Sequence, residues 1–256
     1  MSETIRKSVK IWTCLMTKKD KVEWSATDIS RELDIPVQTV HRLLSSLEES
    51  GMVFKDWETK KYRLGLNLIR MGFSLRNELL ARNSAIPIME RLANKTNGCV
   101  YLTFPEGDEG VLIEYIHAKQ RDLKMEECIG MRAPLCIGAS QKVILAFMNQ
   151  RSQHKITKIL NEKGKIHDLQ LLKKELQTIR GAGLALSFGE MMEGSARIAF
   201  PVFSWQDQVV ASITVKGSEA IFSGSRLEEI VNSAQKAADE LSGELGWVKK
   251  ASEFSN

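Results

Sequence analysis

The sequence has little of what membrane, secreted and metal-binding proteins use. It holds 4 cysteines and 5 prolines in 256 residues. Its longest apolar runs, such as Val143–Met148, fall far short of the roughly 18 residues that a membrane span needs. The first residues are not followed by an apolar run of signal-peptide type. The cysteines are widely spaced, which disfavours a zinc module or a disulfide framework. We therefore expect a cytoplasmic protein without a metal or cofactor.

The motifs of common enzyme classes are also missing. The chain contains no His-Glu-x-x-His, Walker loop, Gly-x-Gly-x-x-Gly or Gly-x-Ser-x-Gly. Residues 152–155 match the nucleophile motif Ser-x-x-Lys, but its companion motifs are absent, and a four-residue pattern occurs by chance. We expect a protein that is not an enzyme. Its histidines are scattered, at His41, His117, His154 and His167.

The positive charge is unevenly distributed along the chain. A length of 256 residues exceeds the roughly 100–200 residues of a typical domain, so two domains are expected. The net charge is +4, and residues 1–76 hold 14 Lys and Arg against 10 Asp and Glu. The remaining residues hold 22 of each kind. The excess in the first third indicates a polyanionic partner for that part of the chain.

Residues 36–51 carry the pattern of a helix with two unlike faces. Pro36 suits the first helical position, and Gly51 suits the residue just past the end. One face is apolar, with Val40, Leu43, Leu44 and Leu47 at helical spacing. An ordinary amphipathic surface helix would show the same stripe. The other face suits a helix in a DNA major groove, because it offers base-reading side chains and no acid before Glu48. These candidates are Gln38, Thr39, His41, Arg42 and Ser45.

The segments around this helix favour the DNA-binding interpretation. Residues 4–18 predict a helix, and Ser25 predicts the N-cap of a short second one. Two helices followed by a longer polar-faced helix form the helix-turn-helix order. After Gly51, residues 52–55 and 61–64 alternate around a polar turn, which predicts a basic hairpin, or wing. Its cations would contact phosphates without reading sequence, at Lys55, Lys61 and Arg63.

The rest of the chain predicts a connecting helix and a mixed domain. Residues 66–80 are helical in pattern, without a breaker except Gly72. The later segments suggest an α+β domain with a curved, largely antiparallel sheet. Helices are expected at residues 86–96, 139–149, 152–161, 168–180 and 224–243, and strands at 99–104, 111–117, 184–188, 195–203 and 209–216.

Residues 35–72, from Ile-Pro-Val-Gln-Thr-Val-His-Arg-Leu-Leu through Tyr62-Arg-Leu-Gly65 to Met71-Gly72, resemble the IclR family of bacterial transcriptional regulators. Weaker similarity continues through residues 130–146, 194–202 and 213–217. The resemblance implies an α+β protein with a winged helix-turn-helix domain (1–65), a linker helix (66–83) and a GAF-like effector-binding domain (84–256). It also implies binding to double-stranded operator DNA as a homodimer or homotetramer.

The resemblance carries the family's effector-contacting positions over to this chain. Family members often have Cys where this chain has Arg197, Ser where it has Lys216 and an acid where it has Ser187. Relative to them, this chain gains two cations and loses an anion. An arginine fork matches a carboxylate, and the helix start at Ala139 would add N–H donors. We therefore expect an anionic effector, such as a dicarboxylate or a sugar acid. The carried-over positions are Ala139, Ser140, Ser187, Arg197, Thr214 and Lys216.

Three readings of function follow from these observations. The first is a sequence-specific regulator, more consistent with a repressor, controlled by a small anionic effector. In an alternative for the second domain, Arg197 and Lys216 pair with Glu190 or Glu193 and no ligand is involved. The second reading is a thiol or redox sensor that uses Cys99, Cys128 or Cys136. The third, an enzyme built on the same sheet, is disfavoured by the missing catalytic motifs.

Overall fold

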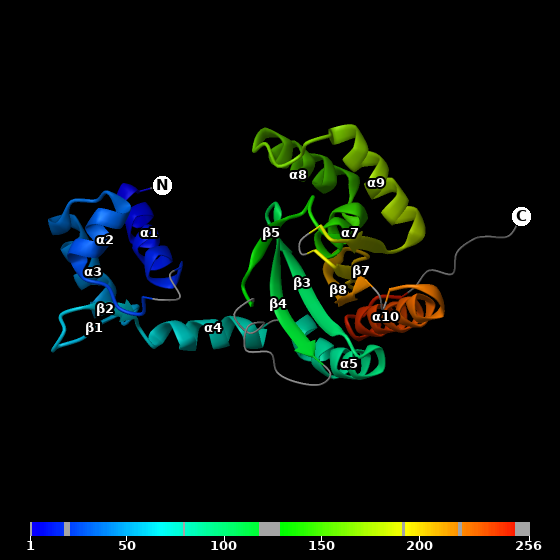
Figure 1. The fold of residues 1–256 in the computed structure, drawn as a ribbon, viewed down its shortest axis with the longest axis horizontal. Coiled ribbons are helices and arrows are strands. Elements are labelled where there is room, and N and C mark those ends of the chain that lie inside the picture. Colours follow the sequence, from blue (N-terminus) through cyan, green and yellow to red (C-terminus); the bar gives the residue numbers. More distant parts are fainter. Residues whose placement is uncertain are drawn as a thin grey trace, which may run out of the picture. The chain divides into compact units, whose positions relative to one another are not determined.

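The chain divides into two compact units, residues 1–79 and 80–256 (Figure 1). The computed structural model describes residues 2–17, 21–78, 80–117, 129–190, 193–219 and 222–248, with the backbone alone at 17, 73–78 and 80. None of the helices within these ranges is long and apolar enough to cross a membrane. Each unit has a hydrophobic core of its own, so the two are described in turn.

Unit 1 is a three-helix cluster with a short hairpin. A core of buried side chains, including Ile11, Trp24, Val40 and Leu44, holds the helices together. Trp24 also exchanges two backbone hydrogen bonds with Tyr62 of the hairpin, at 2.8 and 2.9 Å. This confirms the predicted winged helix-turn-helix. The cluster and hairpin consist of α1 (Glu3–Thr17), α2 (Ala26–Leu33), α3 (Val37–Glu49), β1 (Val53–Lys55) and β2 (Tyr62–Leu64), and a fourth helix, α4 (Asn67–Glu78), follows them.

Local capping sets the turn between α2 and α3. Ser25 accepts a hydrogen bond from the Asp28 N–H at 3.1 Å, which confirms the predicted N-cap of α2. Asp34 ends that helix in the left-handed conformation, at φ 52°. The prediction that Pro36 is the first helical residue is wrong by one position, because its ψ of 134° is extended and Val37 begins α3. The φ of −52° at Pro36 suits either place, so the sequence does not distinguish them.

The end of α3 contacts the beginning of α4 through two glycines. Gly51 follows α3 with φ +70°, and a Cβ there would lie 3.3 Å from the Asn67 Cβ. A Cβ on Gly65 would lie 2.1 Å from the Gly51 carbonyl oxygen. The Gly65 N–H donates to Met52 O at 2.9 Å, and Asn67 Nδ2 donates to Ser50 O at 3.0 Å. Only glycine permits this close approach, which explains the Tyr-Arg-Leu-Gly sequence at the end of the wing.

Unit 2 is built on one six-stranded antiparallel sheet, with strand order β5-β4-β3-β8-β7-β6. This agrees with the expected antiparallel α+β domain, although the short strand β5 was not predicted. Helix α5 begins at Leu80, earlier than the expected residue 86. The strands are β3 (Cys99–Glu106), β4 (Glu109–His117), β5 (Arg132–Pro134), β6 (Ala185–Phe188), β7 (Ser195–Phe203) and β8 (Val209–Ser218), and the helices are α5 (Leu80–Thr96), α7 (Ala139–Phe147), α8 (Gln150–Glu162), α9 (Leu169–Ala182) and α10 (Gly224–Glu244).

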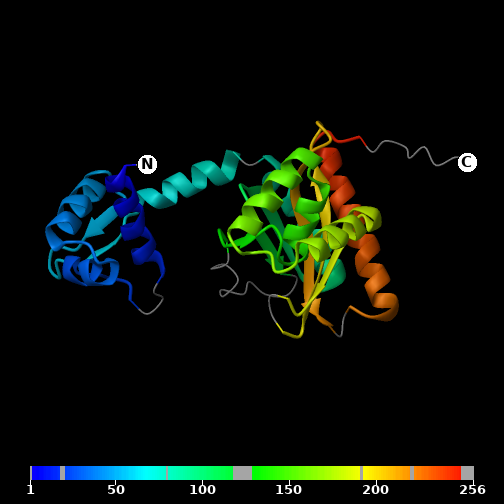
Figure 2. The same cartoon turned by 90° about the horizontal axis from the view of Figure 1, so that it is seen from above.

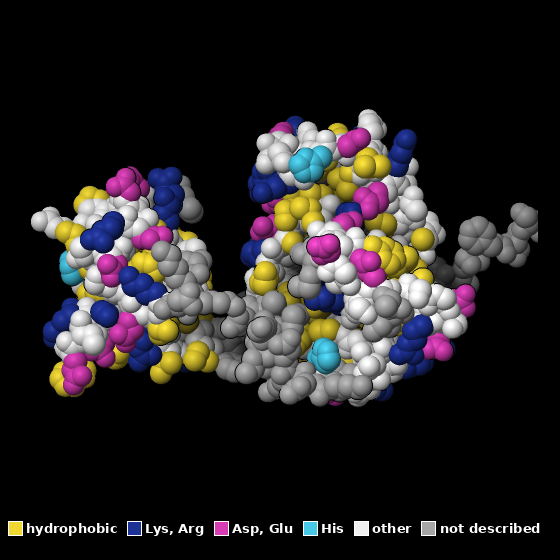
Figure 3. Space-filling model, in the orientation of Figure 1, with side chains coloured by type: hydrophobic (Ala, Val, Ile, Leu, Met, Phe, Trp, Pro, Cys, Tyr) yellow, Lys and Arg dark blue, Asp and Glu magenta, His cyan; other side chains and the backbone are white. Residues whose placement is uncertain are grey.

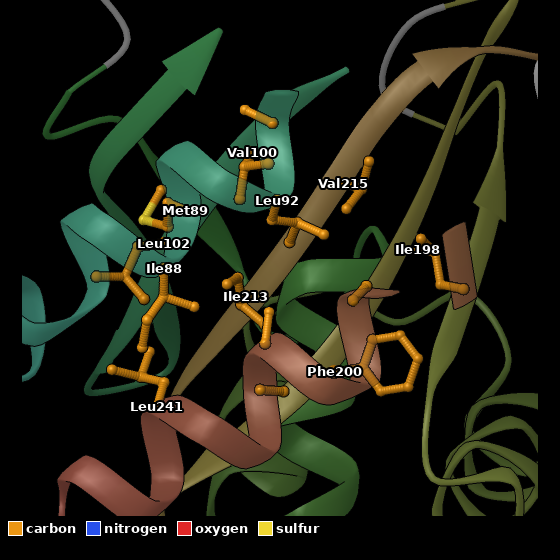
Figure 4. Close-up of a cluster of buried hydrophobic side chains, with 14 of the residues drawn as sticks. Ile88, Met89, Leu92, Val100, Leu102, Ile198, Phe200, Ile213, Val215 and Leu241 are labelled. Atoms are coloured by element: carbon orange, nitrogen blue, oxygen red, sulfur yellow. The ribbon is translucent and has the colours of Figure 1, made fainter. Parts of the chain in front are cut away.

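Helices cover both faces of the sheet (Figure 2). Helices α5 and α10 pack on one face, where Leu92 and Leu241 meet Val100, Ile213 and other strand residues (Figure 4). Helices α7, α8 and α9 form a second core on the other face, around Val143 and Leu160. Because side chains alternate along a strand, every second residue of β3, β7 and β8 points toward the α7 face. That alternation positions the second candidate site.

Candidate functional sites

The exposed face of α3 carries the predicted base-reading residues. Gln38, His41, Arg42 and Ser45 are exposed and Thr39 is half-buried. The opposite face is the buried stripe of Val40, Leu43, Leu44 and Leu47, as predicted. The five polar residues therefore share one accessible surface, formed by the helix that the helix-turn-helix order assigns to the major groove.

The start of α3 is open. In the described part of the chain no side chain caps this helix, and its first turn contains no acid. The first hydrogen bond at its start runs from the Val40 N–H to Pro36 O, at 3.1 Å. Within the described residues, no hydrogen bond is recorded for the N–H groups of Val37, Gln38 and Thr39. These donors and the positive end of the helix can bind a phosphate.

The wing carries its cations beside aromatic rings. The Arg63 guanidinium lies 4.5 Å from the ring centre of Phe54, and the Lys55 Nζ lies 5.4 Å from that of Tyr62. Lys61 is exposed. Stacking on a ring fixes the direction of a cation without neutralising it, so all three predicted residues keep their charge at the surface. Figure 3 shows Lys and Arg side chains of unit 1 on one face, with acids between them.

The Asp56 carboxylate organises the turn of the wing. It accepts hydrogen bonds from the N–H groups of Glu58 and Thr59, at 2.9 and 2.7 Å. The Thr59 N–H bond holds the pKa of Asp56 below its usual range. The acid in the basic hairpin therefore has a structural partner and serves the turn.

In unit 2, the predicted effector contacts lie in two rows across the α7 face of the sheet. Directly paired residues on neighbouring strands point to the same side. The first row runs across five strands in the order His117, Cys99, Lys216, Arg197 and Ser187. The second row lies two residues further along the strands and reads Tyr115, Tyr101, Thr214, Ala199 and Ala185.

Helix α7 meets the second row at its first residues. The Thr214 hydroxyl donates to Ser140 Oγ at 2.9 Å, and the Ser212 hydroxyl donates to Ser140 O at 2.9 Å. Ala139 is 1% exposed and belongs to the core beneath α7. The structure thus brings Ala139, Ser140 and Thr214 together, but Ser140 and Thr214 are bonded to each other.

Arg197 is the main electrostatic feature of the first row. Its side chain is half-buried, and no hydrogen bond or ion pair with another described residue is recorded for it. Burial lowers the pKa of Arg197, against the opposing influence of Tyr101 and Glu190. A buried cation without a counter-charge is costly. The Arg197 guanidinium is thus half-buried without a recorded ion pair among the described residues.

Glu190, one of the two acids that the sequence offered as partners for Arg197, is bonded to other groups. Glu190 accepts a bond from Lys142 Nζ at 2.8 Å and another from the Gly138 N–H at 2.8 Å. Lys142 also bonds Glu175 of α9 at 2.6 Å. Burial lowers the pKa of Lys142, but these carboxylates outweigh burial and raise it overall. The alternative in which Glu190 pairs with Arg197 is thus not what the structure shows.

Sequence reasoning missed this cluster and its consequence for the start of α7. We expected the N–H donors of Ala139 and Ser140 to face an effector, and the structure additionally places the Glu190 carboxylate at the N–H of Gly138, just before the helix. The signal was available, because Lys142 is a charged residue in a helix whose residues 139–146 are otherwise uncharged and all buried. A lysine in such a helix requires a counter-charge.

The cysteines offer little support for a thiol sensor. Cys99 and Cys136 are buried and not in disulfides, and Cys128 lies outside the described residues. Burial raises the pKa of Cys136, which disfavours the reactive thiolate. Across the described ranges there is no group of three or more His, Cys, Asp or Glu residues placed to hold a metal ion.

Comparison with family models agrees with both halves of the structure. Residues 4–56 match the model described as the IclR helix-turn-helix domain. Residues 76–243 match the model described as bacterial transcriptional regulator IclR C-terminal. A similar curated protein is the HTH-type transcriptional regulator KipR of Bacillus subtilis (strain 168), 31% identical over 218 residues, or 84% of this chain and 86% of that protein.

Solved structures share the fold over nearly the whole chain. The crystal structure of the Thermotoga maritima IclR has a TM-score of 0.75 and 26% identity, covering 95% of this chain and 99% of that one. An IclR homolog from Microbacterium hydrocarbonoxydans, complexed with 4-hydroxybenzoate, also has a TM-score of 0.75. It is 21% identical and covers the same shares of the two chains, 95% and 99%. At that identity the similarity shows the fold alone.

Proposed function

This chain belongs to the IclR family and is a transcriptional regulator with a DNA-binding helix-turn-helix, and from that premise we propose how it works. Unit 1 binds operator DNA through α3 and the wing. Unit 2 binds a small organic anion that changes the affinity of unit 1 for DNA. The protein acts as a repressor and as a homodimer or homotetramer, in the cytoplasm where the bacterial chromosome lies.

The observation that carries the DNA-binding proposal is the open start of α3 beside its polar face. Val37, Gln38 and Thr39 present backbone N–H groups that a phosphate can accept. One turn further, Arg42 is exposed on the same helix, and an arginine fork can bind the O6 and N7 atoms of guanine. Phosphate contacts would fix the register of α3, and Gln38, Thr39, His41, Arg42 and Ser45 would read bases.

The wing would add affinity without specificity. Lys55, Lys61 and Arg63 lie on or next to β1 and β2, and their positive charge suits the phosphate backbone. Each such contact releases a counterion, so affinity should fall as salt rises. This division of labour allows the base-reading and phosphate contributions to be separated by experiment.

The effector proposal rests on Arg197 and its row. Arg197 is half-buried beside Lys216, and Glu190 is held by Lys142. An anion at this row would supply the missing counter-charge. The homolog complexed with 4-hydroxybenzoate, a carboxylate, is consistent with such a ligand. An effector shifts the DNA-binding equilibrium only if it binds one conformation better than the other.

Repression is the simpler outcome of such binding. A protein that occupies promoter DNA excludes polymerase without any further contact, whereas activation needs an additional surface for polymerase. A dimer would place two α3 helices one helical turn of DNA apart, so the operator would be palindromic. A promoter-reporter assay with the gene deleted tests the sign, since loss of a repressor raises expression.

The decisive test is selection of bound genomic fragments followed by titration of Arg42→Ala. We expect the variant to lose its preference for the selected operator, by roughly 1–3 kcal/mol for each lost bidentate contact. Its melting temperature and its weak non-specific binding should stay close to those of the unchanged protein. Arg151→Ala, an exposed arginine on α8, is the matched control. Unchanged sequence preference in Arg42→Ala would refute the assigned reading face.

A further inference from the structure

The two rows across the sheet of unit 2 differ in chemistry. The first row contains both cations, Lys216 and Arg197, on neighbouring strands. The second row contains two tyrosines, Tyr101 and Tyr115, also on neighbouring strands. No Asp or Glu occurs among the ten residues of the two rows, all of which the structure describes. The surface is therefore cationic along one row and aromatic along part of the next.

The two cations start from neighbouring positions on the sheet. Directly paired residues on neighbouring strands have Cβ atoms roughly 4.5–5.5 Å apart. Arg197 and Lys216 are such a pair, so both positive side chains begin on the same side of the sheet, in the first row. A dicarboxylate would need a second positive pole at a distance, and the second row contains no cation.

The tyrosines form an apolar cluster of their own. Tyr101 is 6% exposed and Tyr115 is 7% exposed, and they cluster with Cys99 and Leu112 apart from the two large cores. Tyr101 is on β3 and Arg197 is on β7, with β8 between them, and both belong to the rows on the α7 face. The aromatic cluster therefore shares one face of the sheet with the half-buried cation.

Two of the hydroxyl groups on this face of the sheet that could recognise a sugar acid are already in use. Thr214 and Ser212 both donate to Ser140, at 2.9 Å each. A polyhydroxylated ligand requires a matched donor or acceptor for each hydroxyl that it buries. A flat apolar body needs only contact area, which tyrosine rings supply.

Resting on the proposed function of unit 2, we propose that its effector is a monocarboxylate with an apolar ring. The carboxylate binds Arg197, with Lys216 beside it, and the ring lies along Tyr101 and Tyr115. These two tyrosines determine specificity, whereas Arg197 provides the anion contact common to all acids. The proposal keeps the expected anionic effector but replaces the two sequence-based examples, a dicarboxylate and a sugar acid, with a ring-bearing monocarboxylate.

The test is calorimetric titration of the full chain with five probes: benzoate, cyclohexanecarboxylate, benzamide, succinate and gluconate. We expect the two ring-bearing carboxylates to bind at least about tenfold more tightly than succinate or gluconate, because of the apolar area that the ring buries. Benzamide keeps the ring but has no charge, so it should bind at least about tenfold more weakly than benzoate.

Four variants separate the two parts of the site. Arg197→Gln should weaken every acid, whereas Tyr101→Ser and Tyr115→Leu should weaken benzoate by about three- to tenfold more than succinate. Tyr101→Phe keeps the ring and should stay close to the unchanged protein. Phe188→Ser is the matched control, because Phe188 is 51% exposed and points to the opposite face of the sheet from Ser187. Melting curves without ligand verify that each variant folds.

The outcomes distinguish this inference from the function on which it rests. Preference for succinate or gluconate, still dependent on Arg197, overturns the ring-bearing acid and leaves the anionic effector standing. Benzoate binding that depends on Arg197 but not on the tyrosines overturns their role. Binding indifferent to Arg197 overturns the site. If none of the acids binds, both the inference and the effector proposal are wrong, while DNA binding is tested separately through Arg42.

Discussion

Helices α3 and α7 begin in the same way and differ in what meets their first turn. Neither α3 nor α7 has a side-chain cap at its N-cap residue, and neither has an acid in its first turn. At α7 a carboxylate from elsewhere in the chain, Glu190, accepts the Gly138 N–H. At α3 no such carboxylate accepts the first N–H groups, as far as the described residues show.

The difference follows from burial. Residues 139–146 of α7 are all buried, so the charge of Lys142 needs a counter-charge within the protein, and Glu190 supplies one. Helix α3 is buried on one face only, and water can satisfy its free donors until a phosphate replaces it. A helix start that already has a carboxylate beside it therefore contributes to stability, whereas one without a carboxylate is available for an external anion. Four substitutions test this contrast, from the largest expected effect to the smallest.

The largest effect is expected from Lys142→Met. This change leaves Glu175 and Glu190 beside a buried helix without their shared cation. Unit 2 should lose roughly 2–4 kcal/mol, below the upper range for fully buried pairs because both acids are partly exposed. Denaturant titration measures the loss. Lys158→Met removes a surface pair with 69% and 63% exposed side chains and should change stability by less than about 1 kcal/mol. Equal effects of the two changes would contradict a special role for Lys142.

The contribution of Lys142 and its two carboxylates, Glu175 and Glu190, to stability depends on pH with a defined sign. Because the pKa of Lys142 is raised on folding, its contribution is fully present below the pKa of an unfolded lysine. The contribution is lost as pH rises through the folded pKa. Wild-type unit 2 should therefore weaken more in strong alkali than Lys142→Met does. If the melting temperatures of the wild type and Lys142→Met fall in parallel as the pH rises, the charge of Lys142 does not contribute to stability.

Glu190→Gln should have a smaller effect, because it removes the negative charge at the start of α7 but retains an acceptor oxygen. The lost charge weakens the bonds from Lys142 and the Gly138 N–H. We expect unit 2 to lose about 1–2 kcal/mol, as for other hydrogen bonds to charged groups. The control is Glu193→Gln, because Glu193 is exposed and lies, like Glu190, between β6 and β7. If Glu190→Gln and Glu193→Gln have the same melting temperature, the Glu190 carboxylate does not stabilise the start of α7.

Val37→Glu makes the opposite change at the other helix, since it adds a carboxylate to the start of α3, where none is present among the described residues. Val37 is 39% exposed and lies outside the proposed base-reading set. The carboxylate should stabilise unit 1 by about 0.3–1 kcal/mol through the helix dipole. It should also weaken binding to every DNA sequence by about tenfold through repulsion of phosphate. Val37→Gln has nearly the same shape without the charge. Affinity and stability moving in the same direction would contradict a phosphate contact at this helix start.

The smallest effect is expected from Lys61→Gln, on the wing. An exposed lysine on phosphate contributes mainly through counterion release. We expect weaker binding at low salt and a salt slope lower by about 0.9 for each lost contact, with sequence preference intact. Lys165→Gln, an exposed lysine of unit 2, serves as the control. A change in sequence preference would place Lys61 among the base readers instead.

The sequence predicted those parts of the fold that depend on local pattern. The apolar stripe of α3, the Ser25 cap and most strands of unit 2 follow from spacing and turn residues. Strand β5 was missed because three residues, Arg132–Pro134, carry too little alternation to be recognised. Pro36 was misplaced by one position because its fixed φ suits two neighbouring positions.

The electrostatics of unit 2 could not be predicted as completely. The resemblance implied Ser187, Arg197, Thr214 and Lys216 as effector contacts, and the strand register puts the four on one face of the sheet. Which cation takes Glu190 depends on where α7 and the residues beyond β6 meet in space. Spacing along the chain carries no information on that contact, since Lys142 and Glu190 are 48 residues apart.

The two glycines between α3 and α4 have a mechanical consequence. With Gly65 against Gly51 and Asn67 bonded to Ser50, the corner between these helices is stiff. A stiff corner has no compliance to absorb a twist, so α3 must turn by the same angle as the first residues of α4. The exposed face of α3 and the beginning of α4 are thus expected to rotate together as one rigid piece, and bending that relaxes a twist would take place beyond that corner.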